Sequence, residues 1–265
     1  MLVTIATFNV NSVRQRLDAL IAWLRECKAD IVCLQELKCE DHAFPRLALE
    51  DAGYHLAVHG QKTFNGVAIL SKFPIDDMLT GLPGDETDQQ ARYVEAVISL
   101  PGRAVRVASI YLPNGNPLES DKFAYKLGWM KRLRAHAQNL LCHEDALILA
   151  GDYNVIPDDR DCRDPAAWAN DALARPESRQ AWRALAHLGL TDALRAISDD
   201  AGHYTFWDYQ AGAWQRDNGI RIDHLLLSPQ AADCLRGVRI DKHVRGRDKP
   251  SDHVPVMAQF DFPAA

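Results

Sequence analysis

Residues 146–154 read ALILAGDYN, an apolar run that stops at a glycine and is followed by polar positions. Five or six apolar residues bounded by a glycine are typical of a fully buried strand, because a helix needs roughly ten or more. Side chains alternate along a strand, so Asp152 and Asn154 point to the same side where the strand ends. Taken alone, such a stretch is more often a strand followed by a plain Asp/Asn turn than a functional site.

Polar residues end other apolar runs of the chain in the same way. Strand ends in a layered sheet converge on one edge, so residues far apart in the sequence can share one crevice. Asp152 can accept a proton from water, and Asn154 can donate a hydrogen bond to an anionic oxygen. The other positions of this kind are Asn9, Gln35 with Glu36, Tyr111 with Asn114, Asp223, and Asp252 with His253.

Glu36 closes the largely apolar segment VCLQE, residues 32–36. A carboxylate at such a strand end loses hydration unless a cation compensates it, and a divalent metal ion is the usual solution. Glu36 is therefore the leading candidate for a metal ligand.

Charge and length limit the class of protein. The chain has 265 residues, 36 acidic against 30 basic, and a formal net charge of −6. This balance argues against a protein that coats nucleic acid by bulk charge, although residues 122–134 hold five basic residues and no acidic one. No linker, low-complexity run or fixed-period repeat is visible, so a single domain over residues 1–265 is expected.

Cysteine usage and hydropathy indicate the compartment. No basic leader precedes the first strand-like residues, and no apolar run is long enough to cross a bilayer. The six cysteines include no CxxC pair, which is typical of reduced thiols. A cytoplasmic protein that does not enter membranes and acts as a monomer is expected.

Apolar periodicity predicts the remaining elements. A helix is expected over residues 13–27, with Ser12 as its cap. Further helices are expected over residues 121–142 and 177–188, and a long irregular loop with helical pieces over residues 157–176. This order of elements predicts two packed sheets with helices outside. The expected strands are residues 1–9, 30–36, 54–60, 66–71, 93–100, 104–112, 203–210, 222–228 and 254–262, together with the buried run described first.

Seven motifs in order along nearly the whole chain resemble the exonuclease III type of AP endonucleases, within the endonuclease/exonuclease/phosphatase superfamily. The resemblance implies a DNase I-like fold: a four-layered α/β sandwich of two packed mixed β-sheets flanked by helices. It also implies a phosphodiesterase that uses Mg²⁺ or Mn²⁺ and acts on double-stranded DNA. The motifs are TFNVNSVR (7–14), LQELK (34–38), SIYLPNGNP (109–117), LAGDYNV (149–155), YTFWDY (204–209), RIDHLLLS (221–228) and SDHVPV (251–256).

The resemblance further implies roles for individual residues. Some relatives carry an acidic residue where this chain has Asn11, which leaves the number and placement of metal ions open. The implied metal-binding residues are Asn9, Glu36, Asp152, Asn154, Asp252 and His253; the implied catalytic residues are Tyr111, Asp152, Asn154, Asp223 and His253; and Asn114 is implied to contact the reacting phosphate.

Hydrolysis of an anionic phosphodiester needs positive charge and an activated water. We assign Asp152 as the general base that orients this water. Asp223 bonded to one ring nitrogen of His253 would favour the imidazolium and leave the other nitrogen for the phosphate. Alternatively, His253 is itself the base.

Aromatic and basic residues predict the substrate contacts. An abasic sugar calls for a small apolar pocket and for wedges that hold a kinked duplex. Affinity for DNA comes chiefly from cationic side chains against backbone phosphates. The pocket and wedge candidates are Phe206, Trp207, Trp214 and Ile220, and the phosphate-contact candidates are Arg92, Lys122, Lys126, Arg216 and Arg245.

These features predict an enzyme of base excision repair. It would cut duplex DNA 5′ to abasic sites and act on blocked or recessed 3′ ends as a 3′-to-5′ exonuclease and 3′-phosphatase or phosphodiesterase. One alternative keeps the fold but changes the substrate to a non-abasic nucleic acid or a phosphorylated lipid or inositol. A catalytically lapsed DNA-binding module is a third hypothesis, against which the complete set of polar site residues argues.

Overall fold

The computed structural model describes residues 1–263, which form two six-stranded sheets. We call them sheet A and sheet B. In spatial order, sheet A consists of β11 (Leu235–Ile240), β12 (Val256–Asp261), β1 (Leu2–Asn9), β2 (Ile31–Gln35), β4 (Val67–Ser71) and β3 (His55–His59). Sheet B consists of β5 (Ile75–Thr80), β6 (Tyr93–Leu100), β7 (Arg103–Tyr111), β8 (Leu147–Asp152), β10 (Asp223–Leu227) and β9 (Thr191–Asp192).

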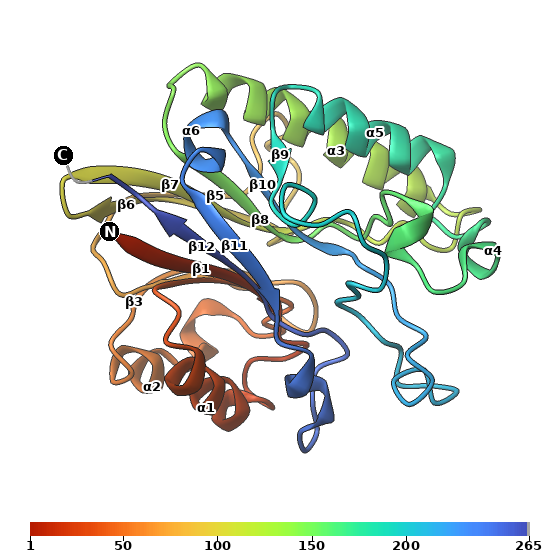
Figure 1. The fold of residues 1–265 in the computed structure, drawn as a ribbon, viewed down its shortest axis with the longest axis horizontal. Coiled ribbons are helices and arrows are strands. Elements are labelled where there is room, and N and C mark those ends of the chain that lie inside the picture. The colour runs from red at the N-terminus through yellow and green to blue at the C-terminus, as the bar shows by residue number, and fades with distance from the viewer. Residues whose placement is uncertain (264–265) are drawn as a thin grey trace.

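Helices cover the outer face of each sheet, which gives four layers (Figure 1). On sheet A lie α1 (Leu17–Cys27) and α2 (Arg46–Glu50), and on sheet B lie α3 (Asp121–Leu141) and α5 (Pro176–Ala186). The expected sandwich of two packed mixed sheets flanked by helices is therefore confirmed. The shorter elements are α4 (Pro165–Trp168), α6 (Pro229–Ala232) and 3₁₀ turns at Asp41–Ala43, Asp159–Asp161 and Lys242–Gly246.

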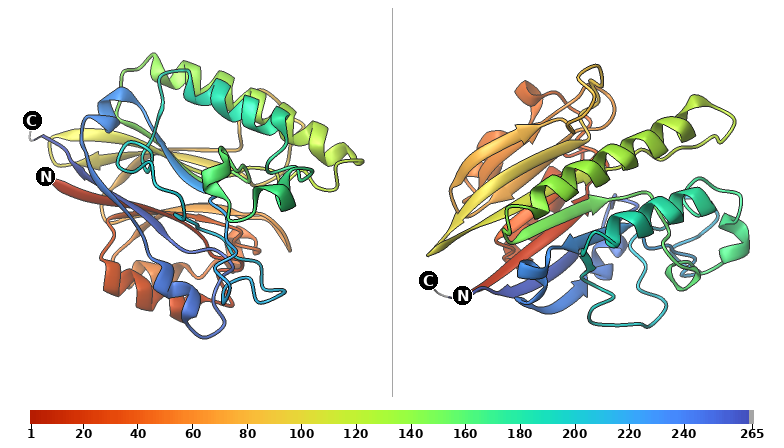
Figure 2. Two further views of the ribbon diagram at one scale, coloured as in Figure 1. Left: turned by 45° about the vertical axis from the view of Figure 1, so that its right-hand side comes forward. Right: turned by 90° about the horizontal axis from the view of Figure 1, so that it is seen from above.

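The main apolar core lies between the two sheets, which face one another in the left view of Figure 2. Ile5 and Cys33 of sheet A meet Val107 and Ile148 of sheet B in this core. Successive inward-facing positions of buried strands supply these side chains, as period-two alternation requires. Inter-sheet packing therefore fixes how the ends of one sheet lie relative to the ends of the other.

Each sheet contains one parallel pair, β1 with β2 and β7 with β8, while the other neighbouring strands run antiparallel. In register, Asn9 lies beside Gln35, Tyr111 beside Asp152, and Asp152 beside Asp223. The strand ends that the sequence singled out therefore meet at one edge.

Several expected boundaries were wrong. The first helix begins at Leu17 rather than at residue 13, and Ser12 has a φ of 87°, which is not the extended conformation of an N-cap. Residues 203–210 form no strand, because only an isolated bridge at Phe206 is present. The edge strands β5 and β11 were missed, since both have exposed positions that break the apolar pattern. Within residues 1–263, no helix has both the length and the apolar character of a membrane span.

Candidate active site

Asn9 links the two sheets at the converging edge. Its side-chain Nδ2 donates to Glu36 Oε1 at 2.8 Å and to Asp152 Oδ2 at 2.9 Å. Glu36 follows the last residue of β2 in sheet A, whereas Asp152 ends β8 in sheet B. Asn9 itself is completely buried. The carboxamide thus holds two carboxylates side by side at the junction of the sheets.

Lys38 balances part of this negative charge. Its ammonium lies 2.9 Å from Glu36 Oε2 and donates to Asn11 Oδ1 at 2.5 Å. Burial alone would raise the pKa of Glu36, but Lys38 and the hydrogen bond from Asn9 outweigh it and lower the pKa. Glu36 is therefore ionised at neutral pH.

His253 and Asp223 form a buried pair beside Asp152. Nδ1 of His253 lies 2.9 Å from Asp223 Oδ2, and Nε2 lies 3.7 Å from Asp152 Oδ2. Burial opposes the imidazolium, yet Asp223 and Asp152 prevail and raise the pKa of His253 to about 10. Burial raises the pKa of Asp152 to about 7, against the pull of His253. Of the two roles open for His253, the geometry favours the charged, phosphate-orienting one.

The residues predicted to contact phosphate lie next to this cluster. Asn114 Nδ2 donates to Asn154 Oδ1 at 3.1 Å, and Asn154 Nδ2 donates to the Leu112 carbonyl at 2.9 Å. Burial and the charges of Glu36 and Asp152 raise the pKa of Tyr111 well above its usual value. The Tyr111 phenol consequently remains a hydrogen-bond donor.

A pocket of about 380 Å³ opens beside the cluster. Phe206 and Ile220 contribute to its wall, and the Phe206 ring lies 5.0 Å from the His253 ring, centroid to centroid. Trp168, the last residue of α4, is a further lining residue that the sequence analysis did not identify. The pocket, whose lining is part apolar and part polar, is thus connected to the polar cluster through the contact of Phe206 with His253.

Comparison with known proteins matches residues 6–253 to the model of the endonuclease/exonuclease/phosphatase family. The chain belongs to that family. It is 31% identical over 262 residues to a Haemophilus influenzae protein named exodeoxyribonuclease III, covering 96% of this chain and 98% of that protein. Two solved structures are similar over 98% of this chain and the whole of theirs. One is the 3′ phosphatase NExo from Neisseria bound to a product DNA hairpin (41% identity, TM-score 0.94). The other is an AP endonuclease from Archaeoglobus fulgidus (37% identity, TM-score 0.93).

The donor set of this family member fits a hard divalent cation. Glu36, Asp152 and His253 each offer a ligand atom, and these three atoms lie within 4.8 Å of one another. Oδ1 of Asp223 is buried and has no hydrogen-bond partner within residues 1–263, which leaves one further carboxylate oxygen nearby free to accept. Carboxylate oxygens suit Mg²⁺ and Mn²⁺. A protonated imidazole offers no lone pair, so the two carboxylates are better ligands than His253.

Asp252 was predicted as a metal ligand but lies outside that group of three. Its Oδ1 accepts hydrogen bonds from Asn11 Nδ2 at 2.9 Å and from Ser251 Oγ at 3.3 Å. Asn11, the position where some relatives carry an acid, therefore holds Asp252 by a neutral hydrogen bond.

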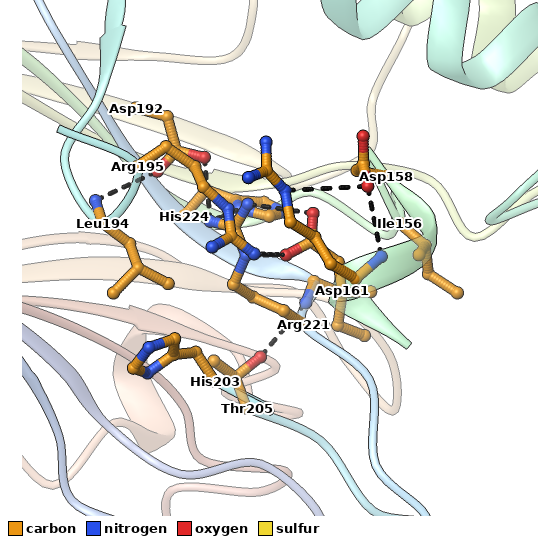
Figure 3. A network of polar contacts seen from close by, with 12 residues as sticks. Ile156, Asp158, Asp161, Asp192, Leu194, Arg195, His203, Thr205, Arg221 and His224 are labelled. Atoms are coloured by element: carbon orange, nitrogen blue, oxygen red, sulfur yellow. Dashed lines mark hydrogen bonds and ion pairs between the residues drawn. The ribbon is translucent and has the colours of Figure 1, made fainter. Parts of the chain in front are cut away.

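A second network, which the sequence analysis missed, is centred on Arg221, two residues before Asp223 in the chain (Figure 3). The Arg221 guanidinium, 2% exposed, donates to Asp161 at 2.6 and 3.1 Å and to Asp192 at 2.8 Å. It also lies 3.0 Å from Nδ1 of His224. The network ties the loop after β8 to the start of β10, on which Asp223 stands. The arginine of the RID motif was the signal that could have revealed it.

Three of the residues predicted to contact substrate have enclosed side chains in this structure. Trp207 is fully buried, with its indole N–H donating to Asp217 at 3.1 Å. Lys126 is fully buried as well. Arg245 is 7% exposed and donates to the Trp207 carbonyl at 3.1 Å. None of the three presents its polar end to DNA in this structure.

The other predicted contacts remain compatible with their roles. Lys122 and Arg216 are exposed, and Arg216 also lines the pocket. Arg92 is half-buried, with its guanidinium 4.8 Å from the centre of the Tyr111 ring. Trp214 packs edge to face on Trp207 and does not line the pocket, so only a wedge role at the surface remains for it.

Proposed function

We propose that this protein is a metal-dependent DNA phosphodiesterase of base excision repair. It cuts duplex DNA 5′ to abasic sites and removes nucleotides, phosphates or phosphodiesters from 3′ ends. The observation that carries the proposal is the largely buried cluster of Asn9, Glu36, Asp152, Asp223 and His253, which a small pocket with apolar walls at Phe206 and Ile220 approaches through the contact of Phe206 with His253. Relatives named exodeoxyribonuclease III, 3′ phosphatase and AP endonuclease support it.

Asp152 is the general base in this proposal. A base is most effective when its pKa lies near the working pH, and burial brings the pKa of Asp152 to about 7. The charged His253, held by Asp223, donates from Nε2 to a phosphate oxygen on the same side of the cluster. Asn154 orients the water or phosphate with Asn114, and Tyr111 donates its phenolic proton to the phosphate.

A Mg²⁺ or Mn²⁺ ion held at Glu36 would supply positive charge to the phosphate and to the leaving oxygen. Asn9 fixes the Glu36 carboxylate for this purpose through its hydrogen bond at 2.8 Å. The proximity of Lys38 keeps the carboxylate ionised.

The pocket receives the sugar of the abasic or 3′-terminal nucleotide. Phe206, Ile220 and Trp168 give it apolar walls, which accept a sugar without a base and hinder an intact nucleotide. Exposed Lys122 and Arg216 would contact backbone phosphates away from the reacting group. The enzyme would act as a cytoplasmic monomer with one domain, on DNA that carries abasic sites or blocked or recessed 3′ ends.

The test is cleavage of two matched duplexes, one with a single tetrahydrofuran abasic analogue and one undamaged with a recessed 3′ end. Each is incubated with Mg²⁺, with Mn²⁺ and with EDTA. Incision 5′ to the analogue that EDTA abolishes is the expected result, and the ratio of the two rates compares endonuclease with exonuclease activity. If neither duplex nor a 3′-phosphorylated primer is cut with either metal, the proposal is wrong and other phosphoesters become the candidates.

A further inference from the structure

Lys126 lies at a point where three loops of the site meet. It stands in the second turn of α3 and is completely buried. Its Nζ donates to the main-chain carbonyl oxygens of Asn154 at 2.6 Å, Asn114 at 3.0 Å and Ala172 at 3.1 Å. An ammonium group has three N–H donors, so each of them is used.

The three loops carry different parts of the candidate site. Asn114 follows β7 and Asn154 follows β8, and their carboxamides are joined by a hydrogen bond of 3.1 Å. Ala172 lies in the loop between α4, whose last residue Trp168 lines the pocket, and α5. Asn116 closes the same junction, because its Nδ2 donates to Asp171 Oδ1 at 3.1 Å and its Oδ1 accepts from the Ala172 N–H at 3.1 Å.

The ammonium is needed where these loops converge. Without Lys126, three carbonyl oxygens would point at one another in a site closed to solvent, and an unsatisfied buried carbonyl is costly. The chain also packs tightly around the lysine stem: a Cβ added at Gly115 would lie 2.7 Å from Lys126 Cδ. The lysine is thus built into the junction rather than available for DNA.

We propose that Lys126 is a positioning residue for the reaction. It sets the carboxamides of Asn114 and Asn154 relative to Asp152 and fixes the pocket loop against them. The inference rests on the proposed function for its kinetic consequences. It predicts that loss of the ammonium slows the chemical step, because the reacting phosphate is misaligned, while DNA contacts outside the junction are kept.

The main test compares Lys126→Met with Lys122→Met, which removes an exposed lysine one turn earlier on α3. Both are assayed on the abasic duplex over a range of salt concentrations. For Lys126→Met we expect kcat to fall about 100-fold, with KM within about threefold of wild type and an unchanged salt dependence. For Lys122→Met we expect a higher KM and a salt slope reduced by about one, with little change in kcat.

Three controls separate positioning from folding. Thermal unfolding shows whether Lys126→Met is folded, and Lys126→Gln, which retains two N–H donors, should recover part of the lost kcat. Gly115→Ala presses on the lysine stem while keeping the ammonium and also strains a backbone with φ of 92°, so it should lower kcat in the same direction; if Lys126→Met does not fold, Lys126→Gln carries the test, with a lowered kcat and an unchanged salt dependence. Wild-type kcat in a folded Lys126→Met protein, or a change confined to KM and salt dependence, would overturn the inference.

A readout without catalysis distinguishes this inference from the proposed function. The side-chain amide signals of Asn114 and Asn154 in ¹⁵N-resolved NMR spectra should shift in Lys126→Met and stay in place in Lys122→Met. If wild-type protein cuts none of the duplexes yet these shifts occur, the proposed function fails and the positioning role stands. If the enzyme is active and the signals do not move, the positioning role fails alone.

Discussion

Replacing Gly151 by alanine should displace the general base through the backbone. A Cβ at this position would lie 2.8 Å from the carbonyl carbon and from the Cβ of Ile110, and closer still to the Ile110 carbonyl oxygen. Ordinary contacts between carbon atoms are about 3.5–4.0 Å, so β8 must move by about 1 Å from β7. Asp152 is the next residue of β8 and would move with it. A misplacement of about 1 Å typically costs about 100-fold in rate.

We therefore expect Gly151→Ala to lower kcat on the abasic duplex about 100-fold and to destabilise the fold by about 1–3 kcal/mol, measured by urea unfolding. The matched control is Gly128→Ala in α3, where an added Cβ meets nothing within 4 Å. That variant should gain about 0.5–1 kcal/mol and keep wild-type activity, because alanine favours the helix. If Gly151→Ala has wild-type kcat and stability, the tight approach of β7 and β8 is not what requires this glycine.

Three further predictions concern charge. Glu36→Gln should raise the Mg²⁺ concentration for half-maximal activity at least about tenfold, and an unchanged requirement would count against Glu36 as a ligand. Asp152→Asn should lower kcat by about 10²- to 10⁴-fold with DNA affinity retained; loss of binding in a filter assay would contradict the base assignment. Burial and the Arg221 guanidinium lower the pKa of His224 to about 4. Between about pH 6.5 and pH 4 the unfolded chain therefore binds a proton that the folded protein does not, and stability falls as the pH falls. The loss of unfolding free energy from this group is up to about 3 kcal/mol. Urea unfolding at pH 7 and pH 4.5 should show this loss in the wild-type protein and not in His224→Gln. Equal losses of unfolding free energy in both proteins would refute the assignment.

The strand ends were predictable because two simple regularities coincide there. Short apolar runs identify buried strands, and the polar residue that ends each run lies at an edge where neighbouring strands also end. Gly151 shows the limit of this reasoning. The sequence analysis took it as the boundary of the strand, whereas β8 continues to Asp152 and the glycine permits close contact with β7.

The full burial of Lys126 and Trp207 was not predicted, and this has a physical reason. Lys126 shares a helix face with Met130, Leu133 and Ala137, at spacings of four, seven and eleven, and all four are buried. The sequence analysis placed this lysine at the surface because of its charge, and only the structure supplies the carbonyl partners that stabilise a buried ammonium. Trp207 lies in irregular chain, where no periodicity determines which of two successive aromatic residues faces the pocket.

The position of the site at the junction of the sheets has a consequence for the whole core. Asn9 belongs to sheet A and Glu36 directly follows its strand β2, whereas Asp152 and Asp223 belong to sheet B. The Asn9 carboxamide connects the two sets by hydrogen bonds of 2.8 Å to Glu36 and 2.9 Å to Asp152. The metal ligand Glu36 and the general base Asp152 come from different sheets. The distance between these two residues is therefore set by the apolar side chains packed between the sheets. A residue such as Ile148, far from any substrate, therefore influences catalysis by fixing the distance between two strand ends.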